Sequence, residues 1–167
     1  MKGDGKRILV FGYGNPGRLD DGLGPAFAEG IEKLGLDGVT VDSNYQLSVE
    51  DSAEIAMHEA VVFADADLSC REPFRFRRVV PKAHMSFSSH SISAEALMAL
   101  AGDLMSSRAE AFMLGIRGYE FNRFGEGLSP GARKNLEAAL ESVGKAIQDD
   151  DLSGLAERFG AESEELR

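Results

Sequence analysis

A strand-like run that leads directly into a glycine-rich loop constrains the fold of this chain more than any other feature of its sequence. Residues 7–11 read RILVF, and residues 12–24 then read GYGNPGRLDDGLG. Gly12, Gly14 and Gly17 have the G-x-G-x-x-G spacing with which a backbone approaches a pyrophosphate at the start of a helix. This junction predicts a buried strand, a tight loop and a helix, the opening unit of an α/β fold.

The two aspartates in this loop argue against a dinucleotide site. Asp20 and Asp21 place negative charge at the start of the predicted helix, where a bound pyrophosphate would lie. Pro16 also removes an N–H group that a phosphate site would use. Asp42 lies near the position of the ribose-binding acid in dinucleotide-binding folds, but we favour a loop that presents carboxylates. One of the two adjacent aspartates is expected to cap the helix.

Apolar runs alternate with helical patterns along the chain. Strands are expected over residues 7–12, 39–42, 60–65, 74–80 and 111–116, and helices over residues 23–34, 49–58, 93–105 and from residue 130 onward. Ser129 before Pro130 is a strong start signal for the last helix. This order predicts a three-layer α/β/α sandwich with a twisted, mostly parallel sheet. Residues 1–148 are expected to form a single domain, followed by an acidic C-terminal tail over residues 149–167 that is a frayed helix or disordered.

Composition excludes several classes of partner. The 167 residues carry a net charge of −10, which repels polyanions, so nucleic acid is not an expected partner. Cys70 is the only cysteine, which excludes an internal disulfide and fits a reducing compartment. No apolar run has the length of a signal peptide or a membrane span. We therefore expect a cytoplasmic protein with no membrane partner, and a monomer.

Acidic residues follow three of the predicted strands. Asp21 follows the first strand through the glycine loop, Asp42 ends the second strand and Asp65 ends the third. Because ligands collect at the carboxyl ends of parallel strands, these acids are expected on one rim of the sheet. His90 precedes the predicted helix from residue 93, whose dipole would keep the imidazole neutral and able to bind a metal. A structural or surface role for this histidine stays open.

Motifs for a nucleophilic enzyme are absent from the sequence. No G-x-S-x-G is present, and Cys70 has no histidine in a cysteine-protease context. His58-Glu59 fails the H-E-x-x-H pattern because residue 62 is Val62. His58 and His84 are expected to be solvated. Metal-assisted chemistry through oxygen and imidazole ligands is the favoured enzyme class, and such ligands suit several divalent ions.

A basic segment over residues 71–78, REPFRFRR, alternates aromatic and cationic residues. This period is typical of a strand with one packed and one solvated face. An edge that docks a peptide or protein partner is the alternative interpretation.

Taken together, these motifs resemble those of the hydrogenase maturation proteases, which trim the C-terminal extension of the large subunit of nickel-iron hydrogenases. Residues 12–15 and 20–24 correspond to the family's G-x-G-N and D-D/E-x-x-G. The likeness continues through Asp42, residues 63–66 and His90, and it covers about residues 7–148. Some members have glutamate at the position of Asp21, and residues 43–47, SNYQL, replace a Gly-Gly of other members. Together with residues 124–129, FGEGLS, this segment resembles the branch associated with cofactor-reducing, bidirectional hydrogenases.

The resemblance implies an α/β/α fold with a metal site formed by Asp21, Asp65 and His90, and with Asp42 nearby as the catalytic acid. The metal is the nickel already inserted in the precursor of the large subunit, so it serves recognition and is not a permanent cofactor. A water activated by the metal or by a carboxylate is the simplest nucleophile. The alternative is a non-catalytic, metal-sensing chaperone that binds the immature subunit without cutting it.

Overall fold

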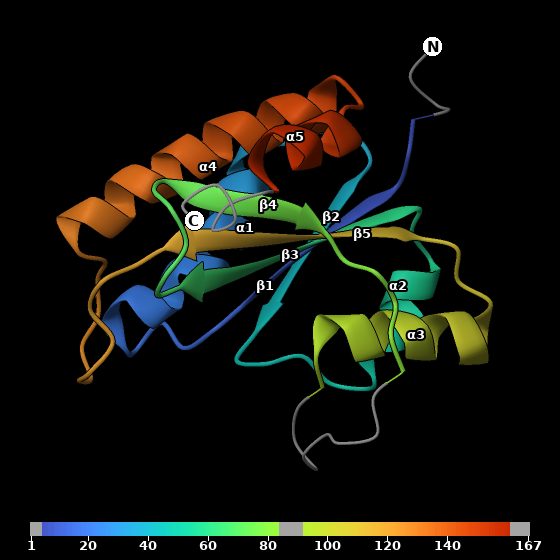
Figure 1. Ribbon diagram of the computed structural model, residues 1–167, viewed down its shortest axis with the longest axis horizontal. Helices are drawn as coiled ribbons and strands as arrows, with labels where there is room; N and C mark the ends of the chain where they lie inside the picture. The colour runs from blue at the N-terminus through green and yellow to red at the C-terminus, as the bar shows by residue number, and fades with distance from the viewer. Residues whose placement is uncertain (1–4, 84–91, 161–167) are drawn as a thin grey trace, which may run out of the picture.

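The computed structural model describes residues 5–83 and 92–160, and it contains five strands and six helical segments in these residues (Figure 1). The strands are β1 (Ile8–Tyr13), β2 (Val39–Asn44), β3 (Ala60–Asp67), β4 (Phe74–Arg78) and β5 (Glu110–Arg117). The helices are α1 (Leu23–Leu34), α2 (Asp51–Ala56), α3 (Ala94–Met105), α4 (Pro130–Gln148) and α5 (Leu152–Phe159), and a short 3-10 helix, η1 (Leu19–Gly22), precedes α1.

The five strands form one sheet in the order β2-β1-β3-β5-β4. The first four are parallel, and only the edge strand β4 runs antiparallel to its neighbour β5. Helices α1, α4 and α5 cover one face of the sheet, and α2 and α3 cover the other (Figure 1). This arrangement confirms the predicted three-layer α/β/α sandwich with a mostly parallel sheet.

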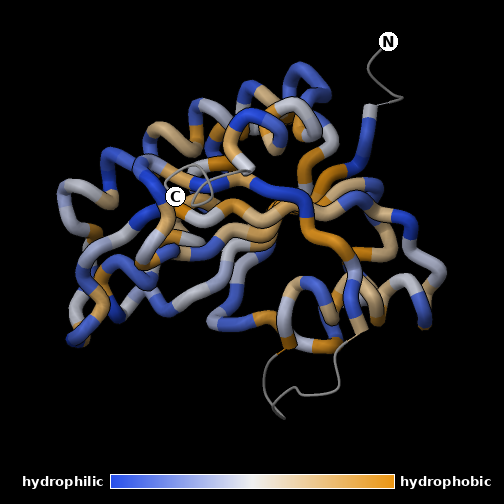
Figure 2. The backbone as a smooth tube through the Cα atoms, viewed as in Figure 1, coloured by the Kyte–Doolittle hydropathy of each residue, from blue (hydrophilic) through white to orange (hydrophobic). Residues whose placement is uncertain are grey.

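Alternate residues of the central strands divide the core into two halves. Val10 and Val62 pack under α1 and α4, whereas Phe11 and Phe63 pack under α2 and α3. All four side chains are at most 1% exposed, as expected for strands that are covered on both faces. Figure 2 shows the same division, because hydrophobic residues follow the strands and the inner sides of the helices.

Helix boundaries that depend on local signals lie where the sequence predicts them. Ser129 caps α4, since its side chain accepts a hydrogen bond from the Ala132 N–H, and Pro130 is the first helical residue. Gly35 ends α1 in the left-handed conformation at φ 63° and donates its N–H to the Glu32 carbonyl oxygen.

The prediction of a frayed or disordered tail is wrong for residues 152–159, which form the packed helix α5. Leu152 and Leu155 are buried in the core half under α1 and α4, and the Phe159 ring lies 4.7 Å from that of Phe74. In the sequence, the acidic residues around this helix obscure its apolar face, although the apolar residues recur at the helical spacing of three and four residues. Residues 161–167 lie outside the described part of the chain. None of the helices described is long and apolar enough to cross a membrane.

Candidate active site

The glycine loop folds back onto the start of its own helix. A Cβ atom on Gly12 would lie 2.1 Å from the carbonyl oxygen of Gly24, and one on Gly14 would lie 2.1 Å from that of Asp21. Gly14 also has a φ of +142°, which side chains rarely tolerate. The glycines therefore allow close contact between β1 and the start of α1, and the backbone itself fixes the position of Asp21.

Asp20 is a structural residue that joins two loops. Its side chain is fully buried and accepts hydrogen bonds of 2.7–3.0 Å from the N–H groups of Tyr119, Glu120 and Ser129 and from the Ser129 hydroxyl. Burial alone would raise the pKa of Asp20, but these hydrogen bonds outweigh it and lower the pKa below the ordinary value. The prediction that Asp20 or Asp21 caps the helix is wrong, because neither η1 nor α1 has a side-chain cap.

Asp21 and Asp65 lie close enough to interact at the carboxyl edge of the sheet. Asp21 is partly exposed, and its Oδ2 accepts a hydrogen bond of 2.8 Å from the Asn15 N–H. The pKa of Asp65 is raised from 3.8 to about 7; burial is the largest cause, the charges of Asp21 and Asp67 add to it, and the hydrogen bond from the Ala66 N–H partly opposes them. A carboxyl that ionises near neutral pH can bind a cation or carry a proton. The role of these two residues as metal ligands stays a prediction.

The third predicted ligand, His90, lies outside the described residues, as does His84. Three residues after His90, Ser93 begins α3 as its N-cap and accepts a hydrogen bond of 3.1 Å from the Ala96 N–H. Within residues 5–83 and 92–160, no three histidine, cysteine or acidic side chains are grouped so that they could hold a metal ion. His58 differs from its prediction, because it is buried and its Nδ1 lies 2.8 Å from the Glu54 carbonyl oxygen.

Asp42 stands apart from the other two acids. It is exposed on the edge strand β2, its Cα pairs with that of Phe11, and its Oδ1 accepts a hydrogen bond of 2.8 Å from the Ser43 N–H. Phe11 pairs in turn with Phe63, two residues before Asp65. With strands about 4.8 Å apart and a rise of about 3.3 Å per residue, the Asp42 and Asp65 Cα atoms are about 12 Å apart. Asp42 therefore shares the sheet face of Asp65 without contacting it, and its catalytic role stays a prediction.

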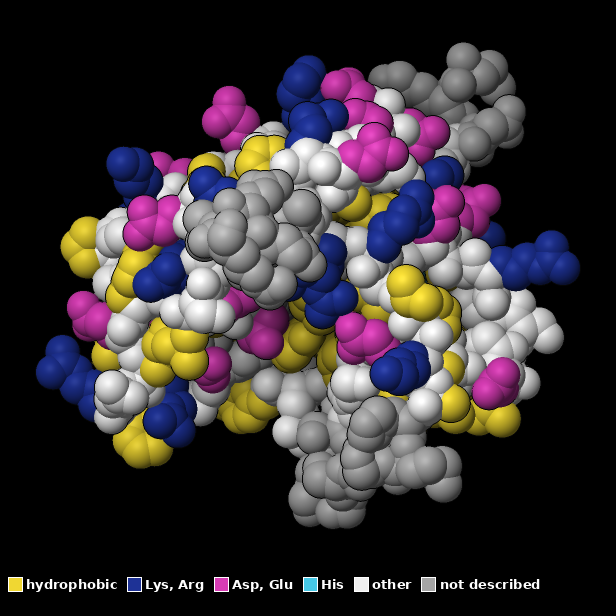
Figure 3. All heavy atoms as spheres, viewed as in Figure 1, with side chains coloured by type: hydrophobic (Ala, Val, Ile, Leu, Met, Phe, Trp, Pro, Cys, Tyr) yellow, Lys and Arg dark blue, Asp and Glu magenta, His cyan; other side chains and the backbone are white. Residues whose placement is uncertain are grey.

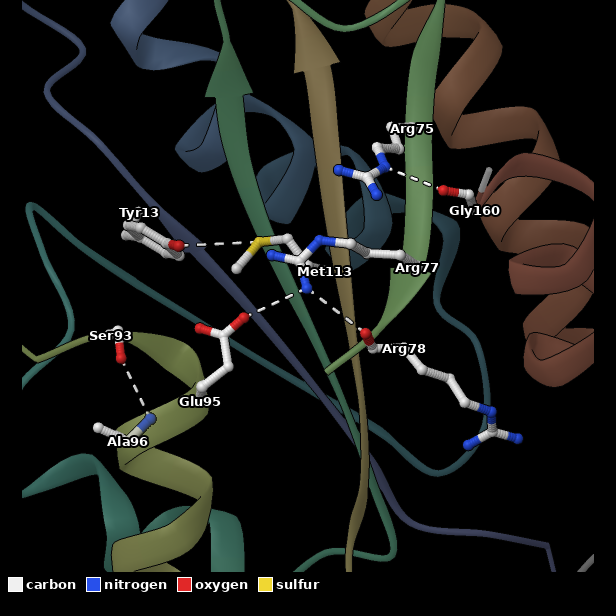
Figure 4. A network of polar contacts seen from close by, with 9 residues as sticks. All are labelled: Tyr13, Arg75, Arg77, Arg78, Ser93, Glu95, Ala96, Met113 and Gly160. Carbon is white, nitrogen blue, oxygen red and sulfur yellow. Dashed lines mark hydrogen bonds and ion pairs between the residues drawn. The ribbon is translucent and has the colours of Figure 1, made fainter. Parts of the chain in front are cut away.

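The sequence analysis did not predict that Tyr13, Met113, Arg77 and Glu95 lie together (Figure 4). The Tyr13 hydroxyl donates to the Met113 sulfur at 3.7 Å, and burial, followed by the charges of Asp65 and Glu95, raises the pKa of this phenol. The Arg77 Nη1 and the Glu95 Oε2 are 3.2 Å apart and join β4 to α3. Tyr13 follows the buried Phe11 by two residues, so strand periodicity places both side chains on the same face of the sheet. Residue type alone, however, did not indicate that Tyr13 lies close to the other three residues.

The basic segment forms β4 and confirms the expected alternation, since Phe74 and Phe76 are buried. Its arginines contact this same chain. Arg75 donates to the Gly160 carbonyl oxygen at 3.0 Å (Figure 4). Arg78 donates to the Ser153 hydroxyl at 2.5 Å. These contacts favour a strand packed within the fold over a docking edge.

Comparison with known proteins identifies the fold. No protein-family model matches this sequence, and no curated protein is significantly similar to it. The structure is similar to the NiFe hydrogenase maturation protease HycI from Thermococcus kodakarensis KOD1, with 20% identity, a TM-score of 0.68 and coverage of 88% of this chain and 96% of that one. It is also similar to the hydrogenase 2 maturation peptidase from Thaumarchaeota archaeon SCGC_AB-539-E09, with 23% identity, a TM-score of 0.64 and coverage of 86% and 99%.

An endopeptidase from Escherichia coli has 23% identity and a TM-score of 0.68, over 86% of this chain and 93% of that one. The match covers nearly the whole length of each of these structures. The chain therefore has the fold of the hydrogenase maturation proteases.

Proposed function

We propose that this chain is an endopeptidase that removes the C-terminal extension of a nickel-iron hydrogenase large-subunit precursor after nickel insertion. The observation that carries the proposal is the pair Asp21 and Asp65 at the carboxyl edge of a fold shared, over 88% of the chain, with a NiFe hydrogenase maturation protease. Ligands of α/β sheets collect at this edge. The charge of −10, the lone buried cysteine and the described helices fit a cytoplasmic protein, which we take to act as a monomer.

Nickel belongs to the substrate in this proposal. Asp21 and Asp65 supply carboxylate oxygens and His90 supplies an imidazole nitrogen, which is a donor set that divalent nickel accepts. Three protein ligands leave coordination positions that the precursor's own groups fill. A precursor without nickel would then lack the main contact that this site recognises.

The cleavage requires one water molecule and two proton transfers. The water oxygen attacks the carbonyl carbon of the scissile bond, the C–N bond breaks, and the leaving amine takes up the proton that the water loses. We assign Asp42 as the carboxylate that holds this proton, which makes the enzyme an aspartic-type endopeptidase. Asp42 is exposed on β2, so its carboxylate is accessible to a bound peptide.

The test is to incubate the purified protein with nickel-loaded and nickel-free precursor and to follow the mass of the large subunit. We expect trimming of the loaded form only. Asp65→Ala and His90→Ala should abolish trimming, whereas Asp37→Asn, an exposed acid before β2, should trim as the wild type does. Equal trimming of both precursor forms would refute the nickel requirement. Binding of the loaded precursor without trimming would favour the metal-sensing chaperone.

A further inference from the structure

Phe124 is the most exposed large hydrophobic side chain in the part of the chain that the structure describes, with 78% of its surface open to solvent. It is nevertheless held in place. The Arg18 guanidinium carbon lies 5.3 Å from the centre of its ring. The Leu19 N–H donates to the Gly125 carbonyl oxygen at 2.9 Å, and the Gly125 N–H donates to the Gly17 carbonyl oxygen at 2.8 Å. Aromatic residues, phenylalanine among them, and arginine are enriched at protein interfaces.

A small pocket lies beside the two loops that these hydrogen bonds join. It has a volume of about 250 Å³ and is lined mainly by apolar side chains, among them Pro16, Leu19, Pro25 and Leu128. Its walls are the glycine loop, the start of α1 and the loop before α4. Figure 3 shows hydrophobic side chains at the surface on this side of the molecule, where β3 and β5 end. The surface thus offers one projecting ring and one recess of the size of an apolar side chain, and we call this pair the Phe124 surface.

The Phe124 surface is continuous with the candidate active site. Arg18 is three residues before Asp21, so their Cα atoms are at most about 11 Å apart. A folded partner with an interface of ordinary size covers about 800 Å² of each protein, which corresponds to a disc of about 16 Å radius. A folded partner of this size that is centred on Asp21 therefore also covers the backbone of Arg18, whose side chain contacts the Phe124 ring.

We infer that the Phe124 surface docks the folded body of the large-subunit precursor, while the C-terminal extension reaches the acids of the site. This inference rests on the proposed function, because it takes its partner from there. Phe124 packs against an apolar patch of the precursor, and an apolar side chain of the precursor fills the pocket. Because backbone pairing fixes the loops before binding, little conformational entropy is lost on docking.

The experiment measures both the Kd for the nickel-loaded precursor of the same organism and the kinetics of trimming. Phe124→Ala should raise Kd and KM at least tenfold while kcat changes less than twofold. Ala26→Gln, which places a longer side chain in the pocket and keeps the helix, should raise Kd at least fivefold. Leu104→Ala is the matched control, because Leu104 is 67% exposed at the far end of α3, and it should match the wild type within twofold.

Every outcome separates docking from catalysis. If the wild type trims and Phe124→Ala has an unchanged Kd and KM, the docking surface is wrong and the proposed function stands. If the wild type binds the precursor without trimming it, a tenfold loss of affinity in Phe124→Ala still supports docking. If the wild type does not bind, or if sedimentation shows that this surface instead joins two copies of the chain, the inference is overturned.

Discussion

Replacing Asp20 with asparagine should strongly destabilise the protein, although the change keeps the shape of the side chain. The carboxylate accepts four hydrogen bonds, and three of them come from backbone N–H groups at Tyr119, Glu120 and Ser129. Three of the four donors bond to Oδ2, so an asparagine amide with its oxygen at that position keeps them. Its NH₂ group then faces the Ser129 N–H and leaves that donor without a partner. An unsatisfied buried group costs about 1–3 kcal/mol, so we expect a loss of about 1–3 kcal/mol in the free energy of unfolding.

Urea denaturation followed by far-ultraviolet circular dichroism measures this loss for Asp20→Asn. The control is Asp21→Asn, which removes the same charge one residue later but disturbs only the hydrogen bond from the Asn15 N–H, and it should cost less than about 1 kcal/mol. A loss for Asp20→Asn that is no larger than that of the control would refute the structural role. The pH dependence has a definite sign. Because the folded-state pKa of Asp20 lies below 3.8, its stabilisation is present above that pH and is lost as the pH falls through the folded pKa.

Three further predictions concern neighbouring features. Asp65→Asn should have the opposite pH behaviour. Because the pKa of Asp65 is raised from 3.8 to about 7, mainly by burial, the metal-free wild type loses stability as the pH rises through this range. In thermal denaturation, the variant should therefore be more stable than the wild type by about 2–4 kcal/mol at pH 8 and should have no advantage near pH 4. Ser129→Ala should cost about 1–2 kcal/mol in urea denaturation, because it removes the α4 cap and one donor to Asp20. NAD, NADP and FAD should not bind in calorimetry, because Asp21 occupies the anion position of the loop; micromolar binding of any of them would contradict this interpretation.

The sequence predicts those parts of the fold that depend on neighbouring residues. Ser129 and Pro130 identify the start of α4, and Gly35 identifies the end of α1, because caps act over a few residues. Asp20 and Asp21 have the same residue type and adjacent positions, so no local pattern separates them. The role of Asp20 depends on partners about 100 residues away in the sequence, and that of Asp21 depends on Asp65.

The candidate site shows the same limit. The rule that acids gather at the carboxyl ends of strands predicts that Asp21 and Asp65 share one edge of the sheet, and the charge of Asp21 contributes to the raised pKa of Asp65. The rule does not predict the register of the strands, however. Asp42 lies on an edge strand and pairs with Phe11, so it is further from the carboxyl edge of the sheet than Asp65. Tyr13, on the face of α2 and α3, was overlooked because its neighbours there come from four different elements.

The buried carboxylate of Asp20 has a consequence for amide exchange with solvent. Irregular segments such as residues 118–129 usually open locally and exchange their amide hydrogens quickly. Here the amides of Tyr119, Glu120 and Ser129 are released only when the carboxylate that they share leaves its pocket. That movement also displaces the loop between β1 and α1, so the two loops open as one cooperative unit. Protection of these three amides would therefore report the integrity of the segment that positions Asp21.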